Sequence, residues 1–197
     1  MALNCEEKLS TDIQKDCDNK PKGGIEVGVV IINFDDIDKV TSTMDVTNDL
    51  IITSLATLSG TTGYLLEGVK QVNGASSEFI LNPEGFDKHS HKFSGVILTP
   101  SSANKKSLSQ MASGGRYVVV IEKKWKGASN VEAFEVLGWD SGLIMSSIVW
   151  NTKEADGVIK FELASESGYE ENELPKTNLE TDYATTKTAF DSKYATA

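Results

Sequence analysis

The residues Ile25-Glu26-Val27-Gly28-Val29-Val30-Ile31-Ile32 decide the fold class, because every residue of this run after Gly28 is apolar and β-branched. A short run of this kind predicts a strand that is buried on both faces. Before it, residues 1–24 are charged and turn-rich and end in Pro21-Lys22-Gly23-Gly24, which predicts an N-terminal arm. After it, the acids of residues 33–40 predict a short helix with Asp35 and Asp36 in its first turn.

Further β-type stretches follow along the chain on both sides of one predicted helix. Between residues 50 and 98 they alternate with turn signals such as Asn73-Gly74, which is typical of an antiparallel meander. The helix is predicted over about residues 101–113, from an N-cap near Ser101 to a C-cap at Gly114-Gly115. Later strands are predicted at residues 117–123, 133–137, 143–150 and 158–164. The expected fold is mainly β: an antiparallel β-sandwich or barrel with one flanking α-helix and extended terminal arms.

The chain of 197 residues is long enough for one domain with elaborated ends. We expect the β-sandwich domain to span residues 25–165 and to be followed by an acidic C-terminal arm, residues 166–197. Residues 183–194 have the apolar spacing of a short terminal helix. A terminus of this length docks on its own domain in a monomer and reaches a neighbour in an assembly.

The net charge of -10 argues against a protein that grips nucleic acid, since such binding depends on Lys and Arg. An acidic channel would instead let a polyanion pass without sticking. The sequence contains no apolar run long enough to cross a bilayer and no signal-peptide pattern, so we expect a protein of the cytoplasm with no membrane partner. Cys5 and Cys17 lack a disulfide or metal spacing, and free thiols are expected.

No catalytic, cofactor-binding or metal-ligating residue stands out, and we predict that the protein is not an enzyme. His89 and His91 would share one face of a strand, but they have no obvious third ligand and are flanked by lysines. The acids of residues 35–38 lack the calcium-loop spacing. The S-x-x-K match at residues 102–105 has no accompanying motif and is better explained as a helix start, and no phosphate loop or hydrolytic triad pattern is present.

One basic and aromatic cluster lies at the tip of a predicted hairpin, where lysines surround Trp125. It would suit either a nucleic-acid contact or a subunit interface, and the acidic chain favours the interface. The C-terminal arm adds apolar residues that could reach a neighbouring subunit. The candidate interface residues are Trp125, Lys123, Lys124, Lys126, Leu174, Tyr183 and Phe190.

A family resemblance is carried by two segments, Gln110 to Glu122 (QMASGGRYVVVIE) and Ala133 to Leu143 (AFEVLGWDSGL). Two shorter stretches add to it, Leu174-Pro175 and Thr181 to Lys187 (TDYATTK). Together with the short arm before Ile25, they resemble structural proteins of tailed phages and prophages of the Bacteroidetes, and in particular a major tail tube protein. The resemblance covers most of the chain loosely, through structural phrases of low specificity.

That resemblance implies a two-sheet β-sandwich with a flanking helix, a hexameric ring, and rings stacked into a tube through which DNA passes without specific binding. The type VI secretion tube protein shares this plan. It implies self-association through sheet edges, a long hairpin and the terminal arms, here residues 50–72, the tip at residues 123–130 and both ends of the chain. The other implied partners are a terminator, a tape measure and, in a contractile tail, a sheath. The implied location is the virion tail, after assembly in the host bacterial cytoplasm, and no catalytic residues carry over.

Two other classes of protein remain open at this point. The first is a different virion component, such as a connector, head decoration or baseplate protein. The second is a ligand- or carbohydrate-binding β-sandwich, in which Trp125, Trp139 and Trp150 would stack on the ligand, although Trp139 and Trp150 are better interpreted as core residues.

Overall fold

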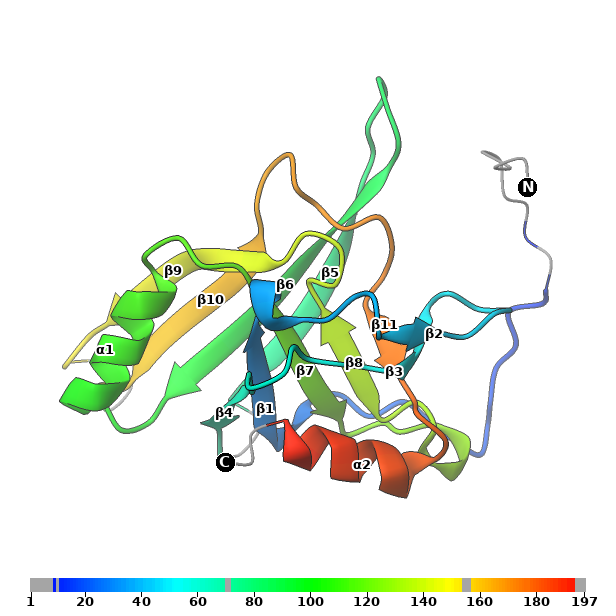
Figure 1. Ribbon diagram of the computed structural model, residues 1–197, viewed down its shortest axis with the longest axis horizontal. Coiled ribbons are helices and arrows are strands. Elements are labelled where there is room, and N and C mark those ends of the chain that lie inside the picture. The colour runs from blue at the N-terminus through cyan, green and yellow to red at the C-terminus, as the bar shows by residue number, and fades with distance from the viewer. Residues whose placement is uncertain (1–8, 10, 70–71, 154–156, 194–197) are drawn as a thin grey trace.

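The structure is a computed structural model, and it describes residues 9, 11–69, 72–153 and 157–193. Within these residues the chain is mainly β, with eleven strands in one sheet and two α-helices (Figure 1). The strands are β1 (Ile25–Asn33), β2 (Thr43–Met44), β3 (Ile51–Ser54), β4 (Tyr64–Glu67), β5 (Gly74–Ile80), β6 (Lys88–Ile97), β7 (Tyr117–Lys123), β8 (Phe134–Leu137), β9 (Leu143–Trp150), β10 (Ile159–Ser165) and β11 (Lys176–Asn178). The helices are α1 (Ser102–Met111) and α2 (Tyr183–Ser192), with 3-10 turns η1 (Phe34–Asp36) and η2 (Ala128–Asn130).

The sheet follows the order β2-β3-β11-β8-β7-β9-β10-β6-β5, and β1 pairs with β7 and β4. Neighbouring strands are antiparallel except for β11 and β3, which are parallel. β7 and β9 are joined only by the bridge between Tyr117 and Leu143. At this narrow join the sheet divides into two parts that face each other, which gives a sandwich-like fold.

The two central strands are buried on both faces, as the apolar run at residues 29–32 predicts. Val29 and Ile31 of β1 point into the first core cluster, between the two parts of the sheet, together with Phe93 and Phe161. Their neighbours Val30 and Ile32 point into the second core cluster. The same alternation runs along β7, so each central strand contributes to both clusters.

Helix α1 confirms the predicted helix almost to the residue. The Ser101 side chain accepts a hydrogen bond from the Asn104 N–H at 3.2 Å, which is an N-cap, and Gly114 follows the helix with a φ of 97°. Leu108 is its buried residue and belongs to the first core cluster. This also confirms that the serine of the S-x-x-K match lies in a helix start.

Two local predictions were wrong. The meander between residues 50 and 98 is absent, because β3 pairs with β2 and β11 while β4 pairs with β1, and only β5 and β6 form a hairpin there. The short helix predicted at residues 33–40 is only the turn η1, since Ile37 already forms a β-bridge with Thr57. The terminal helix predicted at residues 183–194 is confirmed by α2, and the C-terminal segment docks on its own domain: β11 enters the sheet between β3 and β8, and α2 packs on the second core cluster.

Candidate assembly surfaces

The predicted interface hairpin, β7–β8, has its charges neutralised within its own chain. Lys123 Nζ lies 2.5 Å from the Glu135 carboxylate on the paired strand. Lys124 forms an ion pair with Glu26 of β1, and Lys126 forms one with Glu122. Since all three cations have partners beside them, the lysines of this cluster do not form a free basic patch.

Trp125 is half-buried rather than exposed, because the N-terminal segment covers it. Its indole N–H donates to the carbonyl oxygen of Asn19 at 3.0 Å. Asn19 in turn closes a small turn in which Asp16 Oδ1 accepts from the Asp18 and Asn19 N–H groups, at 2.9 and 3.1 Å. The end of the N-terminal arm is therefore attached to the hairpin tip.

The aromatic residues of α2 are also used within the chain. Phe190 is only 3% exposed, and its ring centroid lies 5.2 Å from that of Phe134 in β8. Tyr183 stacks on the same Phe134 ring at 5.8 Å. These contacts make both residues part of the second core cluster, whereas Leu174 remains exposed. The prediction that this set forms a subunit interface stays a prediction, and Leu174 is its member with the most open side chain.

A different hairpin projects from the domain and carries uncovered apolar side chains. Strands β5 and β6 extend well beyond the rest of the sheet (Figure 1), and their connection spans residues 81–87. Phe79, Leu81 and Phe86 are 60%, 69% and 74% exposed. We call these three residues the tip surface. Exposed apolar groups gathered at one projecting point mark an interaction site more often than scattered ones do.

A second group of exposed apolar residues lies at the opposite end of β5. Val27, Val69 and Val72 are exposed and line a shallow hollow together with Asn73, the residue that precedes β5. We call these three valines the base surface. The tip surface lies at the far end of the same strand, so roughly 20 Å of extended chain separates the two surfaces.

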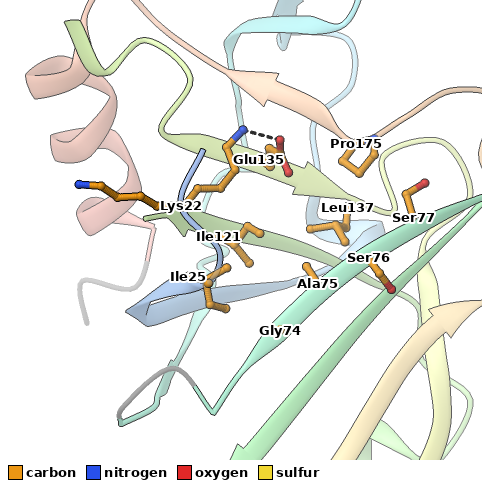
Figure 2. A pocket seen from close by; sticks show the side chains of 12 residues that line it. Lys22, Ile25, Gly74, Ala75, Ser76, Ser77, Ile121, Glu135, Leu137 and Pro175 are labelled. Atoms are coloured by element: carbon orange, nitrogen blue, oxygen red, sulfur yellow. Dashed lines mark hydrogen bonds and ion pairs between the residues drawn. The ribbon is translucent and has the colours of Figure 1, made fainter. Parts of the chain in front are cut away.

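A larger hollow of about 380 Å³ opens beside β5. Figure 2 shows Ile25, Ile121 and Leu137 on one side of it and Ala75 and Ser77 of β5 across from them. The remaining lining residues are Lys22, Gly24, Gly74, Ser76, Lys123, Glu135 and Pro175. We call this hollow the β5 groove. Its size falls in the range of small ligand pockets, but Ile25, Ile121 and Leu137 are almost fully buried behind it.

The β5 strand ends the sheet on this side, and its outer backbone groups can be identified from its partner. The His91 N–H donates to Ser165 Oγ at 2.9 Å, so the backbone groups of His91 point toward β10 and away from β5. Ser77, which lies opposite His91, therefore belongs to a non-hydrogen-bonded pair. By alternation, the N–H and C=O groups of Ala75, Ser77 and Phe79 point to the free edge.

The projecting hairpin is fastened at the start of β6, opposite Phe79, by the connection between β10 and β11, residues 166–175, which we call the strap. Glu171 forms a β-bridge with His89 of β6, with backbone hydrogen bonds of 2.8 and 2.9 Å. Its own carboxylate is buried and accepts from the N–H groups of Asp140 and Ser141, at 2.5 and 2.9 Å. Burial raises the pKa of Glu171, and the two N–H donors oppose that shift.

His91 belongs to the same fastening and is not a metal ligand in this arrangement. Its Nδ1 accepts from the Gly138 N–H at 3.3 Å, and its Nε2 lies 2.9 Å from the Glu173 carbonyl oxygen, to which it donates as a neutral ring. Burial lowers the pKa of His91 to about 4. Among the described residues no group of three or more His, Cys, Asp or Glu side chains is placed to hold a metal ion.

The three tryptophans differ from what a shared stacking platform would need. Trp139 is buried, as predicted, but Trp150 is 53% exposed, so its interpretation as a core residue was wrong. Lys105 lies over the Trp150 ring at 4.3 Å, and Trp125 is covered by Asn19.

Cys17 is a free, exposed thiol, as expected, and Cys5 lies outside the described residues. None of the helices in the described residues has the length and apolarity that a membrane span requires.

The tip surface, base surface and β5 groove were not found from the sequence. The available signal was the presence of Leu81 and Phe86 directly beside the turn Asn82-Pro83-Glu84-Gly85, where polar residues are the norm. Comparison of the chain with protein-family models, with curated proteins and with solved structures gives no match, so the geometry of these surfaces stands alone.

Proposed function

We propose that this chain is a structural subunit of a phage tail tube, which assembles with copies of itself into stacked hexameric rings whose acidic lumen conducts DNA. The observation that carries the proposal is the projecting β5–β6 hairpin, with exposed apolar residues at its tip and a second apolar surface at the other end of β5.

The placement of these two surfaces favours head-to-tail contacts. The tip surface and the base surface are different patches at opposite ends of one strand. When the tip surface of one copy contacts the base surface of the next, the same contact can be repeated from copy to copy. Contacts of this heterologous kind build closed rings or extended polymers, whereas a two-fold dimer buries the same patch from each copy. Stacked rings satisfy this geometry when each tip surface meets the base surface of the next layer.

The charge of the chain supports a passage for DNA rather than a grip on it. Its net charge is -10, and the lysines around Trp125, its one basic and aromatic cluster, are paired with glutamates. A lumen lined by such a surface repels phosphate and does not retain it. Partners of the tube would be further tail proteins at its ends and, in a contractile tail, a sheath around it, and its site of action would be the virion.

The test is negative-stain electron microscopy of the purified full-length protein. We expect rings or tubes with a central channel of about 20 Å or more, wide enough for duplex DNA. Assemblies without a channel would favour another virion component, such as a decoration or baseplate protein. A chain that stays monomeric at high concentration would overturn the proposal and favour a ligand-binding β-sandwich.

A further inference from the structure

We propose that the end of the domain where α1 begins and β9 ends is a docking surface for a short acidic segment of a partner protein. The inference goes beyond the proposed function and does not depend on the formation of rings. The surface, which we call the α1–β9 surface, consists of Leu98, Lys105, Lys106, Ile148, Trp150 and Lys153.

Acidic residues are absent from the two stretches of sequence that build this surface. The chain has 29 Asp and Glu residues, but none of them lies within residues 88–121 or within residues 141–153. The first stretch contains α1 and the second contains β9. Figure 1 shows α1 beside β9 at one end of the molecule, and Lys105 Nζ lies 4.3 Å from the centroid of the Trp150 ring. The fold therefore brings the two acid-free stretches together, although the net charge of the chain is -10.

Trp150 is the aromatic centre of the surface, and it is held in place without being covered. Its indole N–H donates to the Gly157 carbonyl oxygen at 3.1 Å, and the ammonium group of Lys105 lies over its ring. Even so, the Trp150 side chain is 53% exposed. Ile148, two residues before it on the same face of β9, is also exposed, as is Leu98 after β6. An aromatic ring that is fixed in position and open to solvent is a common anchor of protein interfaces.

The lysines of the surface have no acidic partner among the described residues. Lys105, Lys106 and Lys153 are exposed, and the ion pairs of the described chain involve other residues. The lysines around Trp125 differ, since they are neighbours in the sequence and pair with glutamates. The fold thus assembles a second basic and aromatic cluster from distant segments, and no described acid neutralises its charge.

Helix stability does not explain the two lysines of α1. The positive end of a helix dipole favours acids in the first turn, and the negative end favours cations in the last turn. In α1 the first turn has no acid and the last turn has no base, while Lys105 and Lys106 lie in the N-terminal half of the helix. The helix dipole adds to the charge of these lysines, so both favour the binding of a carboxylate.

A short acidic segment fits the surface better than a nucleic acid does. At physiological salt, charges interact over a distance of about 8 Å. A segment of a few residues on the α1–β9 surface therefore interacts mainly with the three lysines. A nucleic acid extends past them and is repelled by the acidic remainder of the chain. The exposed apolar side chains beside Trp150 would contact an aliphatic or aromatic side chain of the same segment.

The test uses the full-length protein and a short synthetic peptide in which glutamates alternate with leucine and phenylalanine. The same peptide with glutamine in place of every glutamate is the matched control. Binding is measured from the indole N–H resonance of Trp150 and from the fluorescence anisotropy of the labelled peptide. We expect the acidic peptide to shift this resonance, with an affinity that falls as salt is added, and the glutamine peptide to leave it unchanged.

Two double variants make the same change in net charge at different places. Lys105→Glu with Lys106→Glu should weaken binding of the acidic peptide roughly tenfold or more, because like charges then meet. Lys20→Glu with Lys22→Glu changes two exposed lysines of the N-terminal segment, which contacts the β7–β8 hairpin, and should bind as the wild type. No binding to the wild type, equal affinity for both peptides, or an equal loss in both double variants would overturn the inference.

Three further outcomes would also reject the acidic protein partner. A single-stranded oligonucleotide that bound at Trp150 more tightly than the acidic peptide would favour a nucleic acid. Loss of assembly in the Lys105→Glu, Lys106→Glu variant, measured by light scattering, would favour a contact between copies. Glu154→Gln with Asp156→Asn removes two acids that follow Lys153 and lie outside the described residues, and it should keep or raise the affinity. A loss of affinity in that variant would contradict a surface that attracts acids.

Discussion

The two hairpins of the sheet use their apolar and charged residues in opposite ways. In β7–β8 the lysines pair with glutamates, Trp125 is covered by Asn19, and Phe134 lies under α2. In β5–β6 the strap pairs with His89, opposite Phe79, but Phe79, Leu81 and Phe86 remain exposed. The first hairpin stabilises its own domain, and the second leaves apolar side chains exposed among the described residues. Side-chain type alone does not distinguish these roles.

The largest expected effect comes from removing the aromatic centre of the first hairpin. Phe134 is fully buried between Tyr183 and Phe190. Phe134→Ala should lower the free energy of unfolding by about 3–5 kcal/mol, since it opens a cavity and removes the contacts of α2 with this ring. Urea unfolding measures this loss. A loss under about 1 kcal/mol would contradict the assignment of α2 to its own domain.

Acid should weaken the contact between the strap and the second hairpin. The pKa of His91 is about 4 in the folded chain, against 6.5 for an ordinary histidine, so the unfolded chain binds the proton first as the pH falls. The contribution of His91 is complete above pH 6.5 and is lost progressively down to about pH 4, a change of about 3 kcal/mol.

The measurement compares the urea unfolding of the wild type and His91→Gln between pH 7 and pH 4. The stability advantage of the wild type should shrink with falling pH by roughly the amount given above. Burial raises the pKa of Glu171, which gives the opposite pH slope, but this group is present in both proteins and its effect cancels in the difference. A constant difference would show that His91 takes up its proton equally in both states.

A smaller loss is expected at the tip of the first hairpin. Trp125→Ala should destabilise the chain by about 1–3 kcal/mol, because it removes a half-buried ring and the hydrogen bond to Asn19. Trp125→Phe keeps most of the ring and should cost only about 1 kcal/mol. Thermal unfolding distinguishes the two variants. If Trp125→Ala changed self-association and left stability unaltered, the result would support the interface role predicted for this residue.

The smallest effect on stability belongs to the tip of the second hairpin. Phe86→Ala makes the same chemical change as Phe134→Ala, but the side chain is exposed, so the free energy of unfolding should change by less than about 0.5 kcal/mol. The same variant should weaken self-association, as light scattering over a concentration series would show. A large loss of stability would mean that the tip contacts its own domain.

The sequence predicts strands well where a local pattern determines them. The β-branched run of β1, the strand β7 and the cap of α1 at Ser101 all follow from neighbouring residues. The partner of each strand does not follow from neighbouring residues, which is why the pairing of β3 with β11 was missed. Pairing depends on contacts between distant segments that a local pattern does not encode.

The sequence did not predict the tip surface, the base surface or the β5 groove for a related reason. The sequence shows the lysines beside Trp125 but not their acidic partners, since Glu26 reaches Lys124 from a strand 98 residues away. Conversely, Leu81 and Phe86 are ordinary core residues by type, and their exposure follows from the projection of β5 and β6 past the sheet. Burial is a property of the whole fold, so a local pattern did not show which apolar and charged side chains would stay exposed.

The most direct test of the central claim is the mass of the particle in solution when the tip surface is made charged. Leu81→Asp with Phe86→Asp should reduce the assembly to single folded chains. Val40→Asp with Val46→Asp, which alters two almost fully exposed valines and adds the same charge, should leave rings or tubes intact. Light scattering that finds the tip variant assembled to the same mass as this control and the wild type would contradict the claim that the β5–β6 hairpin joins the copies.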